Sequence, residues 1–317
     1  MGFYRLGVVG LRVLVTGGAG FIGSHTVDRF LAKGFEVVVL DSLRSGSLDN
    51  VRLHMGDERF KFVCGDVRDV RLVRDLVGGV DFVVHLAALV SVPESMQDPD
   101  LTYDINVNGT LNLLRACVDA DVKRFVYASS CAVYGNADRL PIKEDCPPKP
   151  LSPYAFSKLK AESYVWKYFE DFELETVCLR YFNVYGPRQA YSEYSGVITQ
   201  FINRIKRGLP LTIFGDGEQT RDFVHVEDVV EANMLALKCR NAIGEVFNIG
   251  TGVATSIKQL AQTLLELTNR KDLEILHCEA REGDVRHSVA DISKAKEKLG
   301  YRPKVALKEG LKKLLFD

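Results

Sequence analysis

The sequence predicts an α/β protein built on a doubly wound parallel sheet, with a smaller C-terminal lobe interleaved with it. Strand and helix patterns alternate from Arg12 to about Leu179, a glycine-rich turn joins the first strand to the first helix, and the pattern becomes irregular after Leu179. The chain has 317 residues and is 46% hydrophobic, which suffices for one large domain or two closely associated ones.

Short apolar runs rich in β-branched residues mark the strands, which we expect at residues 12–16, 36–40, 60–63, 81–85, 123–128 and 175–179. The first helical pattern runs from residue 24 to residue 33. A proline-rich loop at 146–150 leads into another helix, whose N-cap and first residue are predicted to be Ser152 and Pro153.

Beyond Leu179, we expect helices at 198–208 and 224–237 and one more strand at 245–249. We therefore assign residues 11–179 and about 222–250 to a nucleotide-binding domain. Residues of about 180–221 and 251–317 form the smaller lobe, and a ligand cleft is expected between the two. Residues 1–10 allow no interpretation.

The segment that follows the first strand predicts a dinucleotide site of the Rossmann type. Gly17 would allow a tight turn, Gly20 a close approach of the backbone to a pyrophosphate, and Gly23 close packing of helix on strand. The helix N-terminus offers unpaired N–H groups to the phosphates. Asp41 ends the next strand, where its carboxylate would bind the adenosine ribose and repel a 2′-phosphate, so NAD is predicted over NADP; Arg44 nearby would soften that preference.

Tyr154 and Lys158 stand four residues apart on the helix that begins near Pro153, so both side chains point from the same face. An ammonium beside a phenol favours the phenolate and lowers the pKa of the tyrosine. Such a tyrosine can take a proton from a sugar hydroxyl and return it. The pattern alone also fits a surface helix with a solvated lysine, and its weight comes from the glycine turn upstream.

Together, the GxxGxxG turn (Gly17, Gly20, Gly23) and the YxxxK pair resemble the short-chain dehydrogenase/reductase superfamily, and the length resembles its extended branch, which acts on nucleotide sugars. The resemblance runs from about residue 11 to the C-terminus. It implies further NAD contacts from the glycine turn, an adenine-side loop, the turn after the fourth strand and a supporting helix: Phe21, Ile22, Asp66, Val67, Leu86, Ala87, Ala88 and Asn106.

Ser130 follows a strong strand, at the sheet edge where ligands of α/β proteins bind. The resemblance implies that it hydrogen-bonds the 4-hydroxyl of the sugar, although a serine that merely completes a turn fits the same pattern. Sugar 4,6-dehydratases that resemble this chain carry an acidic pair at the next two positions, and decarboxylating relatives keep a glutamate there. Cys131 and Ala132 occupy them here, which favours oxidation and re-reduction at C4, the chemistry of 4-epimerases. Nothing in the sequence marks Cys131 as an activated thiol.

The resemblance places the nucleotide-diphosphate part of a UDP-sugar on the smaller lobe, through Asn183, Thr212, Phe214, Arg221, Arg281 and Asp284, and places Ser288 beside the sugar. Arginine suits phosphate because its planar fork makes two parallel hydrogen bonds. Some epimerases restricted to plain hexoses carry a tyrosine at the position of Ser288, so this chain is expected to leave room for an N-acetyl group. Val90 replaces a lysine that lies near the phosphates in some of those enzymes.

The expected function is therefore an NAD-dependent 4-epimerase of UDP-glucose and UDP-galactose, with Tyr154 as the base, Lys158 as its charge partner and Ser130 as the orienting hydroxyl. One alternative is a UDP-glucuronate 4-epimerase or decarboxylase, although no cationic contact for the sugar carboxylate is identifiable. A second alternative is an NAD(H)-sensing regulator on the same fold, which the retained tyrosine and lysine disfavour.

Bulk properties exclude other classes of function. A net charge of −1 argues against nucleic acid as the main partner, and the apolar runs are too short to span a membrane. Seven scattered cysteines without paired spacing suit a reducing cytoplasm, and neither they nor the six histidines show metal-ligand spacing. The resemblance implies a homodimer through helices at about 100–118 and 154–169.

Overall fold

The computed structural model describes residues 10–191, 196–280 and 283–316. Its main sheet has seven strands in the order β11-β6-β5-β4-β1-β2-β3, and every neighbouring pair is parallel. These strands are β1 (Arg12–Thr16), β2 (Glu36–Asp41), β3 (Phe60–Cys64), β4 (Phe82–His85), β5 (Arg124–Ser130), β6 (Thr176–Tyr181) and β11 (Glu245–Ile249). The strand order reverses between β1 and β4, so the predicted doubly wound α/β fold is confirmed.

All seven predicted strands are present, but β5 and β6 each run two residues further than the apolar pattern suggested. Ser129 and Ser130 extend β5 because they pair with Arg180 and Tyr181 of β6. A sequence pattern that looks for apolar residues stops at those polar positions. The extension places the two serines on the rigid edge of the sheet instead of in a loop.

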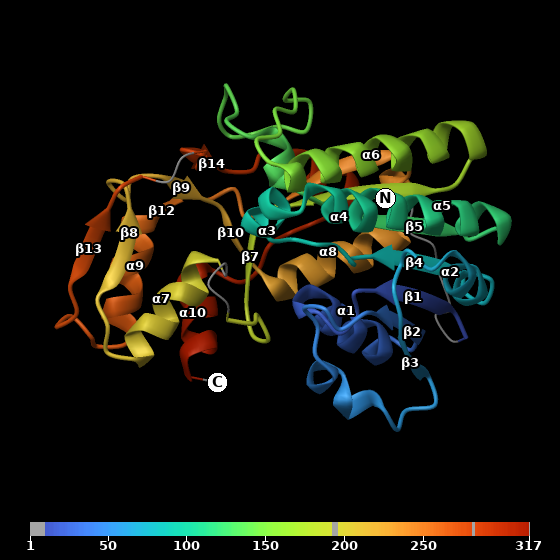
Figure 1. Cartoon of the computed structure of the whole chain (residues 1–317), viewed down its shortest axis with the longest axis horizontal. Coiled ribbons are helices and arrows are strands. Elements are labelled where there is room, and N and C mark those ends of the chain that lie inside the picture. Colours follow the sequence, from blue (N-terminus) through green and yellow to red (C-terminus); the bar gives the residue numbers. More distant parts are fainter. Residues whose placement is uncertain (1–9, 192–195, 281–282, 317) are drawn as a thin grey trace.

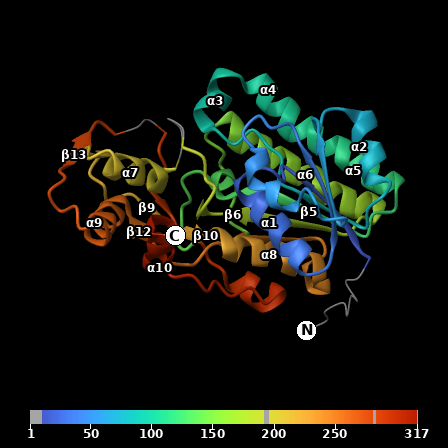
Figure 2. The same ribbon diagram turned by 90° about the horizontal axis from the view of Figure 1, so that it is seen from below.

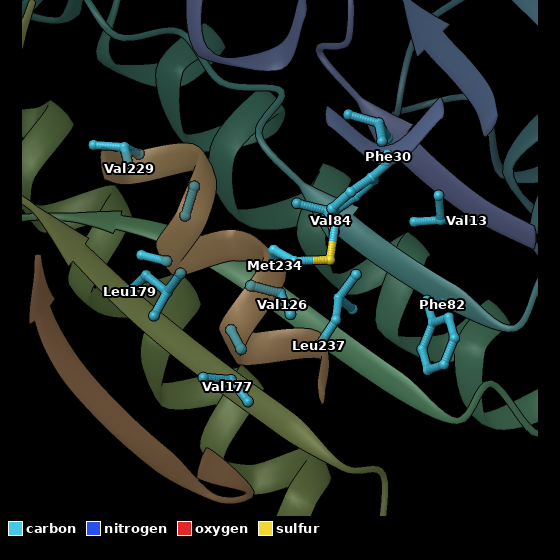
Figure 3. Packing of buried hydrophobic residues seen from close by; sticks show 14 of the residues in the cluster. Val13, Phe30, Phe82, Val84, Val126, Val177, Leu179, Val229, Met234 and Leu237 are labelled. Carbon is cyan, nitrogen blue, oxygen red and sulfur yellow. The ribbon is translucent and has the colours of Figure 1, made fainter. Parts of the chain in front are cut away.

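Helices cover both faces of the sheet (Figures 1 and 2). On one face, α1 (Phe21–Ala32) and α8 (Val226–Lys238) bury Phe30, Met234 and Leu237 against strand residues such as Val84 and Val126, as Figure 3 shows. On the other face lie α2 (Val70–Val77), α5 (Gly109–Asp119) and α6 (Pro153–Phe172). The strands are therefore apolar on both sides, as parallel sheets require.

The start of α6 follows the prediction. Pro153 is its first residue, and the Ser152 side chain caps it by accepting a hydrogen bond from the backbone N–H of Ala155 at 3.2 Å. Two short helices, α3 (Val92–Gln97) and α4 (Pro99–Tyr103), and a π-helical turn over Asp104–Asn108 connect β4 to α5. Both α3 and α4 pack against α6, so the connection after β4 lies beside the predicted catalytic helix.

The smaller lobe lies at the left in Figure 1, and the main sheet lies at the right. Its core is formed by α7 (Val197–Lys206), α9 (Ile257–Leu267) and α10 (Leu307–Phe316). Short ladders join β7 (Asn183–Tyr185) with β10 (Phe223–His225), β8 (Leu211–Phe214) with β13 (Ile275–Cys278), and β9 (Thr220–Arg221) with β12 (Thr255–Ser256) and β14 (His287–Ser288).

The chain passes between the two parts several times. It leaves the main sheet after β6, returns through α8 and β11, and then leaves again for α9. The helix expected over 224–237 begins only at Val226, because Phe223–His225 pairs with β7 as a strand. This pairing ties the start of α8 to the segment that follows β6.

Candidate nucleotide-sugar site

The glycine turn packs too tightly for side chains at two positions. Gly17 has φ +70°, and a Cβ there would lie 2.8 Å from the backbone nitrogen of Ala87. A Cβ on Gly23 would lie 2.0 Å from the carbonyl oxygen of Gly17. The turn therefore presses against the segment after β4 on one side and against α1 on the other, which is the close packing that the motif predicts.

The helix after this turn begins earlier than the sequence suggested, at Phe21 instead of Ser24. Phe21, Ile22 and Gly23 thus form its first turn, and its N-cap, Gly20, provides no side-chain hydrogen bond. The first N–H groups of a helix have no partner within the helix. An uncapped N-terminus above a glycine turn fits a pyrophosphate.

Asp41 ends β2 beside this turn and is held by backbone N–H groups. Ala19 donates to Oδ2 at 2.9 Å and Leu43 donates to Oδ1 at 2.8 Å. The carboxylate is fixed at the carboxyl edge of the strand next to β1, where a ribose-binding acid is needed. Arg44 makes an ion pair with Glu94 at 2.5 Å, so part of its charge is already balanced.

The turn after β4 carries Leu86, Ala87 and Ala88, all partly exposed. Asn106, buried in the π-helical turn, pins this segment: it donates to the carbonyl oxygen of Leu89 at 3.0 Å and accepts from the Leu89 N–H at 2.8 Å. The same side chain donates to Ser157 of α6 at 2.9 Å. Asn106 therefore supports the turn and the catalytic helix together.

Asp66 and Val67 follow β3, where the adenine side was predicted. The Asp66 carboxylate is held by Arg68, whose Nη2 lies 2.8 Å from Oδ2, and this contact lowers the pKa of Asp66. Val67 is buried in the core beside α5.

At the carboxyl end of β5, the structure brings together the three predicted catalytic residues. Ser130 lies close enough to the phenol of Tyr154 to act on its pKa, which it lowers. Lys158 is only 4% exposed and donates from Nζ to the carbonyl oxygen of Ala128 at 2.8 Å. Burial lowers the pKa of Lys158 to about 8, while Glu162 acts to raise it. The ammonium form therefore dominates at neutral pH.

The pKa of Tyr154 differs from the expectation. Burial raises it to about 12, although Ser130 acts in the opposite direction. The predicted lowering of this pKa is wrong for the structure as it stands, because the cost of charging a buried phenol outweighs the interactions that favour the phenolate. Tyr154 is a neutral phenol here at pH 7.

A polar cluster behind Lys158 was missed by the sequence analysis. It joins Ser129 of β5, Glu162 of α6 and Arg180 of β6. Glu162 stands four residues after Lys158, so the same i, i+4 spacing that identified Lys158 could have identified it. Arg180 carried no local signal, because it lies in an otherwise apolar strand.

From the smaller lobe, Arg221 and Ser288 approach the same place. They are neighbours in the β9–β14 ladder, and Ser288 shares a hydrogen bond with the Cys131 thiol. Burial raises the pKa of Cys131 to about 11, so this thiol is not activated. Arg221 also pairs with Asp284 at 2.5 Å. Cys131 thus marks the junction where the end of β5 meets the smaller lobe.

The remaining substrate candidates occupy the smaller lobe or its border. Thr212 and Phe214 lie on β8, and Asn183 lies on β7 with its side-chain Oδ1 buried and without a hydrogen-bond partner. Arg281 lies outside the described residues. Val90, which replaces the lysine of some plain-hexose epimerases, is exposed and follows the turn after β4.

Two cavities are lined by residues other than Ser130, Tyr154 and Lys158. One of about 280 Å³ is bounded by α6 and the edge strand β11 and is lined by residues that include Glu162, Trp166 and Val246. The other, of about 190 Å³, is lined by α7, α10 and the segment around Arg188. Neither contains the glycine turn, Tyr154 or Arg221, so the chemistry of the residues defines the site better than these hollows do.

Residues 13–250 match the model of the NAD dependent epimerase/dehydratase family. The chain belongs to this family. A relative from Methanocaldococcus jannaschii, described as a putative UDP-glucose 4-epimerase, is 41% identical over 305 residues, which cover 96% of this chain and 97% of that protein. The recognised resemblance to extended nucleotide-sugar epimerases is thereby confirmed.

Solved structures agree. The UDP-glucose 4-epimerase of Thermotoga maritima with UDP-glucose is 41% identical, with a TM-score of 0.91 and coverage of 96% of this chain and 97% of that one. The Thermus thermophilus UDP-glucose 4-epimerase complex with NAD is 39% identical, with a TM-score of 0.87 and coverage of 96% and 98%. The family is NAD-dependent, and the glycine turn, the uncapped helix α1 and Asp41 fit this cofactor.

Family members with other substrates are also similar. A UDP-N-acetylglucosamine 4-epimerase from Methanobrevibacter ruminantium is 36% identical with a TM-score of 0.92, covering 97% of both chains. A UDP-glucuronic acid 4-epimerase from Bacillus cereus is 34% identical with a TM-score of 0.90, covering 96% and 98%. Bovine dTDP-D-glucose 4,6-dehydratase is 37% identical over 317 residues, covering 96% and 87%. The chain is therefore an enzyme of the UDP-sugar epimerase and dehydratase family.

Within the described ranges, none of the helices is both long and apolar enough to cross a bilayer. The same residues contain no group of three or more histidine, cysteine, aspartate or glutamate side chains arranged to hold a metal ion.

Proposed function

We propose that this protein is a 4-epimerase that interconverts UDP-glucose and UDP-galactose with tightly bound NAD+. The observation that carries the proposal is the end of β5, where Ser130 meets Tyr154 beside Lys158 while the next two positions, Cys131 and Ala132, offer no carboxylic acid. A dehydratase of this family needs acids there to remove water from the sugar. Epimerisation needs none, because the proton leaves and returns at the same hydroxyl.

In this proposal, Gly17, Gly20 and Gly23 let the backbone approach the dinucleotide, and Asp41 binds its adenosine ribose. When bound, NAD+ supplies the chemistry of hydride removal from C4 and of hydride return to the opposite face. Tyr154 accepts the proton of the 4-hydroxyl and later gives it back. Ser130 orients that hydroxyl, and the ammonium of Lys158 favours the phenolate during the transfer.

The smaller lobe would anchor the UDP part. Arg221 is well placed to bind the diphosphate, and its pairing with Asp284 positions its guanidinium. Asn183, Thr212, Phe214 and Arg281 complete the proposed nucleotide contacts. A fixed UDP group would let the keto sugar turn over while it stays bound.

The decisive experiment incubates the purified protein with UDP-galactose and measures UDP-glucose. Tyr154→Phe should lower kcat by about 100- to 10,000-fold and leave the increase in Tm on adding UDP intact. Absence of any UDP-galactose turnover by the wild type would refute the function, and substantial turnover by Tyr154→Phe would refute the base. A silent NAD(H)-sensing regulator would bind NAD without turnover.

The small side chain of Ser288 supports acceptance of N-acetylated sugars as a second part of the proposal. Ser288 is small and neighbours Arg221 in the β9–β14 ladder, so no bulky side chain stands at this position. We expect turnover of UDP-N-acetylglucosamine, measured as kcat/KM against UDP-glucose. Ser288→Tyr should reduce the N-acetyl activity more than the UDP-glucose activity. Turnover of UDP-glucuronate in place of both sugars would favour the alternative substrate.

We also propose a homodimer through the helices at about 100–118 and 154–169. Trp166 on α6 is 46% exposed, and Tyr164 and Tyr168 are only partly covered by the core. The mass in solution should be twice the 35.4 kDa of the chain. A monomeric mass at micromolar concentration would refute it.

A reducing, cytoplasmic setting completes the proposal. All seven cysteines are free thiols in the structure, and disulfides are rare in reducing compartments.

A further inference from the structure

Three consecutive residues at the end of β5 each contact α6. The carbonyl oxygen of Ala128 accepts the hydrogen bond from Lys158 Nζ at 2.8 Å. The hydroxyl of Ser130 lies near the phenol of Tyr154 and acts to lower its pKa. Between them, the hydroxyl of Ser129 donates a short hydrogen bond to Oε1 of Glu162. The middle contact therefore joins the same strand and helix as the two contacts that hold the catalytic groups.

Glu162 stands four residues after Lys158 and eight after Tyr154, so all three project from one face of α6. Its side chain is 7% exposed, and Arg180 binds both of its oxygens, Nε to Oε1 at 2.9 Å and Nη2 to Oε2 at 2.7 Å. Arg180 is in turn held by the hydroxyl of Tyr134 at 2.9 Å and the carbonyl oxygen of Glu144 at 3.1 Å. The carboxylate is thus fixed on both sides.

The charge of Glu162 also acts on Lys158, whose pKa it raises against the effect of burial. Titratable and charged groups surround this lysine from three strands as well as from its own helix. His85 of β4, Tyr127 of β5 and Glu162 of α6 face Lys158 directly, and Cys178 and Arg180 of β6 and Tyr154 of α6 act on Tyr127 or Glu162 in turn. Arg180 balances part of the charge of Glu162. The hydrogen bonds of Glu162 therefore fix this arrangement more than its charge does.

We propose that Glu162 is a positioning residue: through Ser129 it fixes the end of β5 to α6, and so holds Lys158 and Ser130 around the hydroxyl of Tyr154. The inference rests on the proposed function, because it assigns a purpose only if Tyr154 exchanges the proton. Side chains that hold catalytic groups within a fraction of an ångström act on kcat more than on substrate binding.

A second arginine–glutamate pair, with a buried arginine and a glutamate that is 31% exposed, provides the comparison. Arg124 at the start of β5 binds Glu175, the residue before β6, at 2.6 Å. This pair joins the same two strands at their other end, far along the strands from Tyr154. A purely structural role for Glu162 predicts that disrupting either pair has similar effects on the enzyme.

The experiment measures kcat and KM for UDP-galactose, the pH profile of kcat, and Tm with and without UDP. Ser129→Ala removes the link to the strand but keeps the Glu162–Arg180 pair, and should lower kcat by about 10- to 100-fold with little change in KM. Ser163→Ala, whose hydroxyl is exposed and bonds only to the carbonyl oxygen of Lys160 in its own helix, is the matched serine control and should leave kcat unchanged.

Glu162→Gln keeps an acceptor for Ser129 but removes the charge that raises the pKa of Lys158. Lys158 then loses its ammonium proton at a lower pH than in the wild type, so the alkaline limb of the kcat profile should move to lower pH. Glu175→Gln, the control, should lower Tm without moving this limb.

Wild-type kcat in Ser129→Ala would overturn the inference, and so would an unmoved alkaline limb in Glu162→Gln. An equal shift in Glu175→Gln would overturn it as well, since the effect would then follow stability. If Tyr154→Phe retains turnover, the proposed function fails first. If Tyr154→Phe is inactive while Ser129→Ala matches the wild type, only the positioning role fails.

Discussion

Arg124 offers a sharp test of how the main sheet holds α8. Its side chain is 1% exposed, and its Nη1 donates to three carbonyl oxygens at the C-terminus of that helix, those of Ala236, Leu237 and Cys239, at 2.9–3.0 Å. Its Nε and Nη2 bind Glu175. One guanidinium thus caps a helix end and pairs with an acid.

We predict that Arg124→Met lowers the free energy of unfolding by about 3–5 kcal/mol, because three buried carbonyl oxygens lose their donor at a cost of about 1 kcal/mol or more each. Unfolding entropy scales with chain length and is about 0.7 kcal/mol/K for 317 residues. The loss therefore corresponds to a decrease in Tm of about 4–8 °C. Differential scanning calorimetry measures it directly.

The matched control is Arg12→Met. Arg12 lies at the start of β1, pairs with Glu36 at 2.7 Å, and is 47% exposed. Exposed pairs contribute about 0–1 kcal/mol, so its Tm should fall by no more than about 2 °C. Equal losses in the two variants would refute the capping argument.

A double variant separates the helix cap from the ion pair. If the pair with Glu175 dominates, Arg124→Met/Glu175→Met should recover stability, because no uncompensated charge remains. If the cap dominates, the three carbonyl oxygens still lack their donor and stability stays low. The geometry favours the second result, because Glu175 is 31% exposed and can be solvated. Full recovery in the double variant would refute this reasoning.

Three further predictions follow from individual contacts. Gly23→Ala should abolish retention of NAD on gel filtration, because the new Cβ would lie 2.0 Å from the carbonyl oxygen of Gly17. Gly56→Ala is the control and should retain NAD, because a Cβ there meets nothing within 4 Å. Retained NAD in Gly23→Ala would contradict the packing argument. Cys131→Ala should keep kcat within about threefold of the wild-type value, because burial raises the pKa of this thiol to about 11. In thiol labelling followed by mass spectrometry, the exposed Cys64 and Cys278 should react before Cys131. His85 bridges Thr16 and Thr110, and burial lowers its pKa to about 3 from 6.5. The unfolded chain therefore takes up the proton first, and stability present above pH 6.5 is lost as pH falls towards 3. Tm of the wild type should fall more steeply between these limits than Tm of His85→Asn, and parallel curves would contradict it.

Much of the nucleotide-binding half could be predicted because its signals are local. The apolar runs of the strands, the spacing of Gly17, Gly20 and Gly23, and the capping of α6 by Ser152 each involve residues close in sequence. Even there, boundaries differed where a local pattern competed with pairing: β5 continues through two serines because β6 offers them partners.

The buried cluster of Ser129, Glu162 and Arg180 escaped prediction for the opposite reason. Its members are 18 to 51 residues apart, and each has an ordinary local environment. The pKa of Tyr154 was mispredicted on similar grounds, since helical spacing reports the nearby ammonium but not the desolvation imposed by the surrounding protein.

By itself, the sequence determined the doubly wound sheet, the dinucleotide turn and the position of Tyr154 and Lys158 on one face of one helix, because periodicity, glycine sterics and helical spacing act over a few residues. Only the tertiary structure decided which groups share buried space: Glu162 with Ser129 and Arg180, Cys131 with Ser288, and Arg124 with the end of α8. Those contacts depend on how distant segments exclude water together, and burial of that kind sets both the stability of the sheet and the protonation of its catalytic edge.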